Sequence, residues 1–406
     1  MRNKIFILIF LLCSMSGAVL GQIFFRGAWI ATVANIDWPS TKAVGNDSLQ
    51  KAEMTWLLDS LQSLGLNAII LQVRPTADAL YYSELEPVSH WLTGKQGEWE
   101  SQEWDPLEWT IEEAKKRGLE VHVWLNPYRV NLAQTDTAIL ARDHIMRRHP
   151  EWFWCYARQW YFDPGLEETR EWICTVVQDI VTRYDIAAIH MDDYFYPYPQ
   201  GRSQLPDTKT FERYPRGFED IKDWRRDNVN LAIKAIHETI KECKPEVEFG
   251  ISPFGVWRNA SVDSTGSKTT AGITNYDDLY ADIRLWIKEG WVDYVLPQLY
   301  WEIGKKAADY EVLAHWWANE VRGTKCKLYI GMAPYRLEGA STKSPWGRGN
   351  EIGRQMKLNR TIEEISGECF YSTRPLLRNP RHVCDTIRLI YKDDRAQETT
   401  DFLPWE

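Results

Sequence analysis

Two adjacent carboxylates, Asp192 and Asp193, stand where an apolar run at residues 186–191 gives way to an aromatic segment at residues 194–197. A short apolar run is typical of a parallel strand that is buried on both faces. Carboxyl groups at the end of such a strand can donate protons, attack or orient a substrate, as in glycoside hydrolysis. Because aromatic rings stack on the apolar C–H faces of sugars, the neighbouring Tyr194 favours a carbohydrate site. The alternative is that the aspartates only cap the next helix.

Eight apolar, β-branched or aromatic runs alternate with helical patterns along the chain, which predicts a repeated βα unit. The runs lie at residues 25–32, 67–74, 119–126, 186–192, 247–252, 292–300, 326–332 and 368–372. Eight such units predict an α/β fold, a (β/α)8 TIM barrel with its active site at the C-terminal ends of the strands. We expect one barrel domain over residues 22–406, because no Ser-, Pro- or Gly-rich linker divides the chain.

Helical patterns fill the intervals between these runs. They include residues 48–64, 106–117, 167–184, 228–243, 277–289 and 309–322, and glycine follows four of them at Gly65, Gly118, Gly290 and Gly323. Glycine is common directly after a helix because it adopts the left-handed conformation without strain. Long segments follow the third, fourth and fifth strands, at residues 127–167, 194–226 and 253–276. Since all three leave strand C-termini, they predict long loops over the active-site face and favour an extended substrate.

Polar and aromatic residues stand at the predicted C-terminal ends of seven strands. The candidates for substrate binding are Arg74, Asp78, Asn126, Tyr128, Arg129, His190, Tyr194, Trp257, Arg258, Gln298, Tyr300 and Trp301. Singly, each has a structural explanation, such as a salt bridge or a satisfied backbone group. Together they favour a binding site, because stability alone does not need polar groups on so many strand ends. We expect the rings of Trp257 and Trp301 on the rim, in contact with glycan.

Residues 1–21 have the pattern of a secretory signal peptide, with Arg2 and Lys4 before an apolar stretch and a small-residue cleavage site. We therefore expect an exported protein, in the periplasm or the cell envelope. Cys13 raises a lipid anchor as an alternative, which the preceding Leu12 does not favour. No later stretch approaches the ~18 uninterrupted apolar residues that a membrane span needs.

The charge balance and the cysteines argue against several partners. Of the 48 Lys and Arg residues two lie in residues 1–21, which leaves 46 against 57 Asp and Glu, a net charge of −11. Such an acidic chain does not favour nucleic acid. The six later cysteines form no CxxC pair and no His/Cys cluster at zinc spacing, so we expect no metal and no cofactor. They are either disulfides, which export permits, or buried free thiols.

Many of these residues fall in motifs that are specific in combination. The motifs lie at residues 25–29 (FRGAW), 37–39 (DWP), 73–75 (VRP), 78–81 (DALY), 124–129 (WLNPYR), 189–197 (IHMDDYFYP), 251–258 (ISPFGVWR) and 297–301 (PQLYW). Together they resemble the glycosyl hydrolase-like family 10, over nearly the whole chain after residue 21. The resemblance implies an exported bacterial TIM-barrel glycosidase that acts on a polysaccharide or oligosaccharide. A branch of that family acts on peptidoglycan glycan strands that lack stem peptides.

Asp192 is the first candidate for the essential carboxylate, because strand alternation with His190 directs its side chain toward the barrel axis. Asp193 is the second. If the substrate carries 2-acetamido groups, the pair resembles that of substrate-assisted glycosidases. One aspartate is then the general acid, the other orients the acetamido group, and Tyr300 hydrogen-bonds its carbonyl oxygen.

A rival mechanism uses two separated carboxylates, about 5 Å apart for retention or 6.5 to 9.5 Å for inversion. Glu302, the third catalytic candidate, or Asp78 would then be the partner, and the sequence leaves both mechanisms open. Three other functions also stay open: a carbohydrate-binding barrel without catalysis, a hydrolase of neutral polysaccharide, and a metal-dependent deacetylase or phosphoesterase. The last needs several His and acids on one ion, and only His190 and His122 of the 8 His lie on predicted strands.

Overall fold

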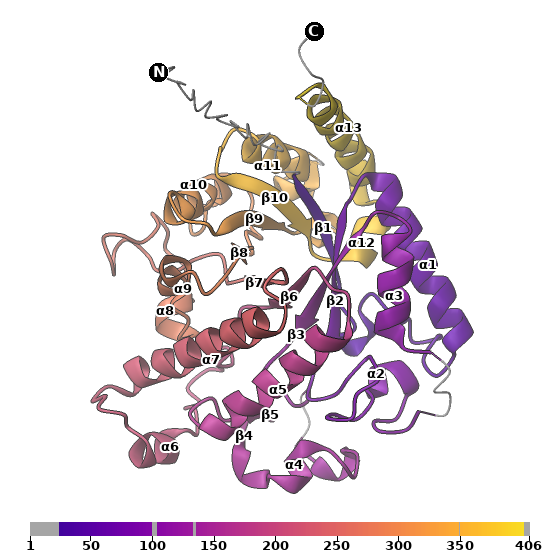
Figure 1. Cartoon of the computed structure of the whole chain (residues 1–406). Coiled ribbons are helices and arrows are strands. Elements are labelled where there is room, and N and C mark those ends of the chain that lie inside the picture. Colours follow the sequence, from indigo (N-terminus) through magenta and orange to yellow (C-terminus); the bar gives the residue numbers. More distant parts are fainter. Residues whose placement is uncertain (1–23, 100–103, 133–134, 349, 402–406) are drawn as a thin grey trace, which may run out of the picture.

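Eight parallel strands close into a barrel that helices surround (Figure 1). The computed structural model describes residues 24–99, 104–132, 135–348 and 350–401, so the expected signal peptide lies outside the described residues. The barrel strands pair in chain order, and the last pairs with the first. They are β1 (Phe25–Ile30), β2 (Ala68–Arg74), β3 (Glu120–Leu125), β6 (Ala188–Met191), β7 (Glu248–Ile251), β8 (Tyr294–Val295), β9 (Lys327–Met332) and β10 (Ile365–Phe370). The predicted (β/α)8 barrel is confirmed.

The longer helices cover the outside of the barrel, and several short helices lie within the segments that connect the strands. They are α1 (Asp47–Leu64), α2 (His90–Thr93), α3 (Pro106–Lys115), α4 (Ile145–Arg148), α5 (Glu167–Arg183), α6 (Thr208–Arg213), α7 (Ile221–Cys243), α8 (Asn275–Asp278), α9 (Ile283–Glu289), α10 (Tyr310–Val321), α11 (Glu351–Asn359), α12 (Thr373–Leu377) and α13 (Val383–Asp401). The four glycines predicted to follow helices all have left-handed φ, from 66° to 89°. Helix α7 begins seven residues before its predicted start, because the Asp220 side chain caps it by accepting from the Lys222 N–H.

Three predicted elements differ from the structure for local reasons. The helix expected over 277–289 is split into α8 and α9, and Tyr280 between them has a φ of 55°. The strand expected over 292–300 is reduced to the two residues of β8, because Pro297 has no N–H to donate to a sheet. Beyond β8, the predicted strand pairs with its neighbours only through isolated bridges from Gln298 to Phe254 and to Gly331. Strand β10 begins at Ile365, three residues before its predicted start.

The barrel interior is a small aromatic core of its own, formed by alternate residues of the strands. Gly250 on β7 makes room for it, since a Cβ there would lie 1.8 Å from the ring of Tyr294. The Tyr294 hydroxyl thereby lies 2.9 Å from Nδ1 of both His122 and His190. On β6, Ala188 belongs to this interior core while Ile189 packs toward the helices. This confirms the predicted alternation, which directs residue 192 to the axis.

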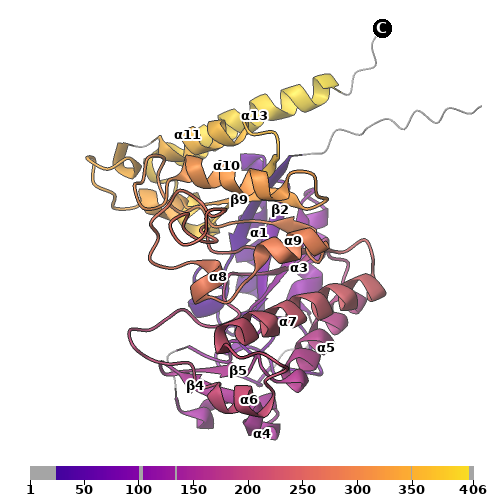
Figure 2. The same ribbon diagram turned by 90° about the vertical axis from the view of Figure 1, so that its left-hand side faces the viewer.

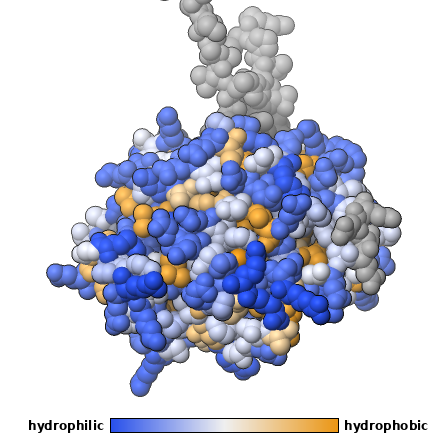
Figure 3. Space-filling view, turned by 60° about the horizontal axis from the view of Figure 1, so that its bottom comes forward, coloured by the Kyte–Doolittle hydropathy of each residue, from blue (hydrophilic) through white to orange (hydrophobic). Residues whose placement is uncertain are grey.

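Long segments gather at one end of the molecule. A β-hairpin of β4 (Phe153–Tyr156) and β5 (Gln159–Phe162) leaves the end of β3, and the segment that contains α6 leaves the end of β6. Figure 2 shows both at the lower end, with α11 and α13 at the upper end. Figure 3 brings the lower end forward, and its surface is mostly hydrophilic with small scattered apolar groups.

No helix in the described part of the chain is long and apolar enough to cross a membrane. Six cysteines lie in that part, and all are free thiols. Of the two alternatives for the cysteines, free thiols are therefore what the structure shows, with Cys326, Cys369 and Cys384 buried.

Candidate functional site

A cavity of about 290 Å³ opens at the C-terminal ends of the barrel strands, directly above the aromatic interior. Its lining residues are Trp29, Val33, Gln72, Trp124, Arg129, Asp192, Asp193, Tyr194, Tyr198, Ser252, Gln298, Tyr300 and Tyr371. Six of them were singled out from sequence: the two aspartates, Arg129, Tyr194, Gln298 and Tyr300. The cavity joins aromatic rings with carboxylates at the face where barrel enzymes place their chemistry.

Asp192 is 7% exposed and is the first residue after β6. Its Oδ2 accepts a hydrogen bond from the side-chain amide of Asn126. Its Oδ1 is buried and has no hydrogen-bond partner among the described residues. Burial, followed by the charge of Asp193, raises the pKa of Asp192 to about 7. A carboxyl group with this pKa still carries its proton near neutral pH and can act as a general acid.

Asp193 is equally buried, at 6% exposure, but its carboxylate is better supported. The Tyr198 hydroxyl donates to its Oδ2. Burial raises the pKa of Asp193 to about 6, and the hydrogen bond from Tyr198 acts in the opposite direction. The two carboxyl groups differ in their surroundings, because Asp193 accepts from a tyrosine hydroxyl while one oxygen of Asp192 has no partner among the described residues. Burial raises the pKa of both. Adjacent carboxyl groups in different environments can divide the acid and base roles between them.

A chain of amide groups fixes the orientation of Asn126. The Oε1 of Gln72 accepts from the backbone N–H groups of Thr32 (3.0 Å) and Val33 (2.9 Å), so its Nε2 must face the other way. That Nε2 donates to the Oδ1 of Asn126 over 2.6 Å, and Arg129 donates to the same oxygen over 3.0 Å. The Nδ2 of Asn126 is thereby turned to Asp192.

Aromatic rings also line the cavity. Tyr300 lies with its ring centroid 6.0 Å from those of both Tyr335 and Tyr371. Trp29 packs edge-on against Tyr371 at 5.9 Å. The indole N–H of Trp124 is buried and has no partner in the described part of the chain. Rings and unpaired donors of this kind are what a sugar-binding cavity needs.

His190 lies beneath the cavity floor and is fully buried. Its Nε2 accepts from the indole N–H of Trp29 over 3.3 Å and lies 3.0 Å from the Ser252 hydroxyl. Because Nε2 is an acceptor, the ring proton must be on Nδ1, which faces the Tyr294 hydroxyl at 2.9 Å. Burial keeps the pKa of His190 well below its usual range, so the ring is neutral. His190 therefore positions Trp29 and Ser252 rather than lining the cavity.

The structure does not bring the two proposed partner carboxylates into the cavity lining. Asp78 is fully buried and accepts from Thr76 (2.7 Å) and Gln96 (3.0 Å). Burial raises its pKa, but contact with His90 and the hydrogen bonds from Thr76 and Gln96 together bring the pKa below its usual range. Glu302 accepts from the indole of Trp346 over 2.8 Å and pairs with Lys305 at 3.4 Å.

Arg74, Tyr128 and Trp301 also lie outside the cavity lining. Arg74 forms a two-pronged ion pair with Glu86 (2.5 and 2.6 Å) and donates to the backbone oxygen of Asn126 over 2.7 Å. It thus holds the backbone at Asn126 in place. Tyr128 is 1% exposed in the outer core. The half-buried ring of Trp301 packs against Phe254 with centroids 5.4 Å apart.

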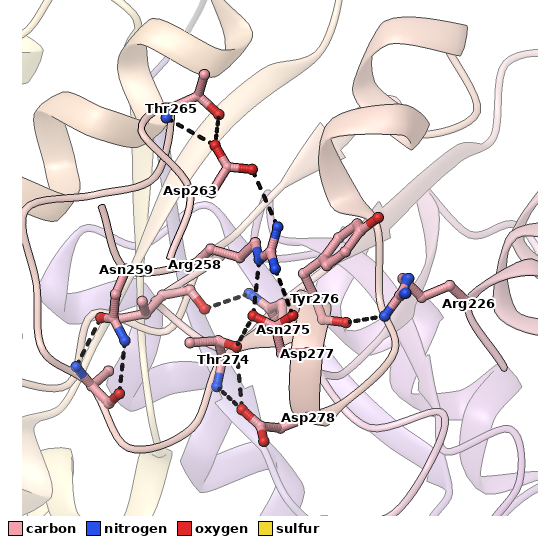
Figure 4. Close-up of polar contacts among 12 residues, drawn as sticks. Arg226, Arg258, Asn259, Asp263, Thr265, Thr274, Asn275, Tyr276, Asp277 and Asp278 are labelled. Carbon is pink, nitrogen blue, oxygen red and sulfur yellow. Dashed lines mark hydrogen bonds and ion pairs between the residues drawn. The ribbon is translucent and has the colours of Figure 1, made fainter. Parts of the chain in front are cut away.

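The expected rim position of Trp257 is wrong. Its ring is 5% exposed and stacks on Trp316 with centroids 5.9 Å apart, because the loop after β7 folds back over the helices. Arg258 is held beside it by Asp277 (2.9 Å) and Asp263 (3.2 Å), as Figure 4 shows. We call Arg258, Asp263 and Asp277 the Arg258 cluster. The cluster borders a separate hollow between α9 and α10, away from the aspartate pair.

Six aromatic or polar lining residues are not among the candidates predicted from the sequence: Trp29, Gln72, Trp124, Tyr198, Ser252 and Tyr371. Ser252 follows a predicted strand and lies in the motif at residues 251–258. Gln72 has a detectable signal in the sequence, since it is a polar residue inside the largely apolar strand β2 (Ala68–Arg74). Trp29 and Trp124 stand on strands at inward-facing positions, where a large ring is also a normal core residue. Tyr198 and Tyr371 had no signal beyond being aromatic. No group of three or more His, Cys, Asp or Glu residues gathers as a metal site in the described part of the chain.

Comparison with known proteins agrees with this geometry. The family model for "Glycosyl hydrolase-like 10" matches residues 24–347. Glycosyl hydrolase YngK of Bacillus subtilis is 49% identical over 89% of this chain and 70% of its own length. Glycosyl hydrolase DigH of Escherichia coli K12 is 40% identical over 85% of this chain and 82% of its own. The PgaB glycoside hydrolase domain of Bordetella bronchiseptica, at 11% identity, shares the fold with a TM-score of 0.54, over 90% of this chain and 98% of that domain.

Proposed function

This chain belongs to the glycosyl hydrolase-like 10 family and is a glycoside hydrolase, and we propose that it cleaves amino-sugar glycan with Asp192 as the general acid. The observation that carries the proposal is the state of the Asp192 carboxyl group. One of its oxygens has no partner among the described residues, and its pKa is raised to about 7 beside a second carboxylate. A proton held there is available to a leaving group in the cavity.

In the proposed reaction the 2-acetamido oxygen of the substrate attacks the anomeric carbon. The bond from that carbon to the glycosidic oxygen breaks, and Asp192 gives its proton to that oxygen. Asp193 accepts the acetamido N–H and balances the charge of the bicyclic oxazolinium ion, while the Tyr300 hydroxyl donates to the acetamido oxygen. Water then adds to the anomeric carbon and returns a proton to Asp192. The acetamido group is restored, and the anomeric configuration is retained.

The position of the other acids supports this route over a two-carboxylate mechanism. Asp78 and Glu302, the partners considered for that mechanism, both lie outside the cavity lining and are paired with other side chains. The cavity lining contains two carboxylates, and they are adjacent in sequence. Substrate-assisted chemistry needs no nucleophile from the protein on the opposite face of the sugar.

For the substrate we propose peptidoglycan glycan strands that lack stem peptides. These strands carry 2-acetamido groups on every sugar and no bulky peptide, which suits a cavity of about 290 Å³ among aromatic rings. A neutral polysaccharide is the alternative, and it would require the two-carboxylate route. We also propose that the protein is exported, from the signal-peptide pattern at residues 1–21. The N-terminal sequence of protein recovered from the periplasm tests this point.

The first test measures reducing ends released from peptide-free glycan strands, chitooligosaccharides and a neutral polysaccharide. We expect release from the first two and none from the third. A thiazoline analogue of the oxazolinium ion should inhibit far more strongly than the product sugar, since it resembles the transition state. Release from the neutral polysaccharide alone would refute the acetamido mechanism. Binding of all three without release would make the protein a carbohydrate-binding barrel.

Tyr300→Phe tests the role of the acetamido oxygen. The loss of one preorganised donor costs roughly 10²-fold in kcat, and we expect little change in KM because the contact strengthens only in the transition state. Tyr335→Phe removes a hydroxyl from the neighbouring ring and is the matched control. Trapping a covalent ester on any carboxylate with a 2-fluoro sugar would contradict the mechanism.

A further inference from the structure

Gln72 is a fully buried polar side chain on β2, and its amide group has one orientation. Its Oε1 accepts from the backbone N–H groups of Thr32 and Val33, at 3.0 and 2.9 Å. Because both partners are main-chain donors, a flipped amide would place N–H against N–H. Gln72 Nε2 therefore always presents a donor to the Oδ1 of Asn126, 2.6 Å away.

Asn126 has one orientation for the same reason. Its Oδ1 receives donors from two sides, from Gln72 and from the guanidinium of Arg129 over 3.0 Å. A guanidinium has N–H donors and no acceptor, so a flipped Asn126 amide would meet donors on both sides. The Nδ2 of Asn126 is therefore the group that faces Asp192, and it donates to the Oδ2 of that residue.

The order of these donors decides which oxygen of Asp192 carries the acid proton. A proton on Oδ2 would point at the N–H of Asn126, which already donates to that oxygen. The proton is therefore on Oδ1, which has no hydrogen-bond partner among the described residues. Because Asp192 lines the cavity, Oδ1 can release this proton to a substrate without first breaking a hydrogen bond to the protein.

The surrounding charges do not select an oxygen in this way. The charged and titratable groups that face Asp192 include Asp193, Arg129, Tyr194, Tyr198 and Tyr371. Burial raises the pKa of all three tyrosines, so their hydroxyls stay neutral near neutral pH. The charge of Asp193 opposes ionisation of Asp192, and that of Arg129 favours it. Both act through space, whereas Asn126 holds one particular oxygen through a directed hydrogen bond.

We propose that Gln72 and Asn126 are positioning residues that confine the acid proton of Asp192 to Oδ1. The proposal rests on the function proposed above, because it assigns the atom from which that reaction takes its proton. The Oδ1–H bond breaks as the glycosidic oxygen takes the proton, and the electron pair stays on the carboxylate. Asn126 then stabilises the new charge through Oδ2. Without the donor at residue 72, the Asn126 amide is free to turn, accept from an Oδ2–H and hold the proton away from the substrate.

The test measures the pKa of the Asp192 carboxyl group in the ligand-free protein by carbon-13 NMR, together with kcat and KM for glycan hydrolysis. The signal that is lost in Asp192→Asn protein identifies the residue. The variants are Gln72→Leu, Asn126→Leu and the double variant. Gln50→Leu is the matched control, because Gln50 is also buried and donates to two backbone oxygens, over 2.9 and 2.8 Å, but does not line the cavity.

We expect Gln72→Leu to raise the pKa of Asp192 by about 1, since a hydrogen bond to its charged form is weakened. We also expect kcat to fall roughly tenfold with KM little changed, a part of what a general acid contributes. Asn126→Leu should have the same effects more strongly. Because Gln72 acts through Asn126, the double variant should resemble Asn126→Leu rather than show the sum of both effects. Gln50→Leu should lower the Tm and leave the pKa and kcat unchanged.

Gln72→Glu is a second variant that keeps the acceptor for the two backbone N–H groups and removes only the donor to Asn126. It should shift the pKa of Asp192 in the same direction even if Gln72→Leu does not fold. An unchanged pKa in both variants at residue 72, or additive effects in the double variant, overturns the positioning role and leaves the proposed function standing. If the wild-type protein hydrolyses no glycan, the proposed function fails, and the NMR measurements still decide whether Gln72 and Asn126 control this carboxyl group.

Discussion

Two polar clusters leave strand ends of the same barrel, and they are built in opposite ways. In the Arg258 cluster each acid pairs with the guanidinium, and the side chains are 20 to 34% exposed. In the Asp192–Asp193 pair the carboxylates are more deeply buried, have neutral donors, and one oxygen has no partner among the described residues. The pKa of Asp263 in the first cluster lies below its usual range, mainly through hydrogen bonds from Thr265. The pKa values of the buried pair lie above theirs.

This difference separates a structural role from a chemical one. An exposed ion pair contributes little to stability. Because its charged groups already bind each other, they are not free to bind a ligand. A buried carboxyl group with an unpaired oxygen is destabilising, and its burial is what adjusts its pKa for proton transfer. The residue types in the two clusters are similar, so the distinction lies in their surroundings.

The largest effect is expected from Asp192→Asn, which tests whether the buried pair has the chemical role. The change keeps the shape of the side chain but removes the transferable proton, so we expect kcat to fall by ~10² to 10⁴. Asp277→Asn, the same substitution in the Arg258 cluster, should leave kcat unchanged. Wild-type turnover by purified Asp192→Asn protein would remove Asp192 from the mechanism.

The same variant should be as stable as the wild type, or more so. An unfolded aspartate has a pKa near 3.9, and the folded value is raised to about 7. Between these values the folded state binds more protons, so wild-type stability falls as pH rises through this window. The asparagine side chain of the variant cannot ionise. Its stability advantage should therefore grow from pH 4 to pH 7, which denaturant unfolding at several pH values measures.

Trp257→Ala tests whether the residue next to Arg258 belongs to the core. Loss of a buried tryptophan costs ~3 to 5 kcal/mol of unfolding free energy, and we expect that loss with kcat/KM of the folded protein unchanged. Trp56→Ala is the matched control, because that ring is 58% exposed. Weaker glycan binding at an unchanged Tm would instead return Trp257 to the binding site.

Tyr198→Phe tests whether Asp192 and Asp193 have different roles in the reaction. The Tyr198 hydroxyl stabilises the charged form of Asp193, so its loss should raise the pKa of that carboxyl group. The acidic limb of the kcat/KM profile, which reports protonation of Asp193, should then move to higher pH while the basic limb stays in place. A shift of the basic limb alone would exchange the roles of the two acids.

Asp277→Asn should have the smallest effect. Arg258 keeps its contact with Asp263, and an exposed ion pair is worth ~0.2 to 1 kcal/mol. We expect a loss of unfolding free energy in that range, diminishing at high salt. A loss of several kcal/mol in denaturant titration would show that the cluster supports the loop after β7 more than its exposure indicates.

Much of the fold was predictable because it depends on local patterns. Apolar runs gave the eight strands, and the glycines at 65, 118, 290 and 323 marked four helix ends. The prediction erred where one residue interrupts a pattern, as at Pro297 and Tyr280. Six predicted site residues line the cavity. Arg74, Tyr128 and Trp257 do not, because residue type at a strand end does not reveal which side the chain turns to.

The sequence by itself determined the barrel, the inward direction of Asp192 and the family, since periodicity and motifs are properties of the chain. Only the tertiary structure decided which acids share the cavity with Asp192 and which are paired elsewhere. The tertiary structure also brings Gln72 and Tyr198, which come from distant segments of the chain, into the lining of the same cavity. The physical reason is that a pKa and a free oxygen depend on burial and on neighbours far away in sequence, and these exist only once the barrel has closed.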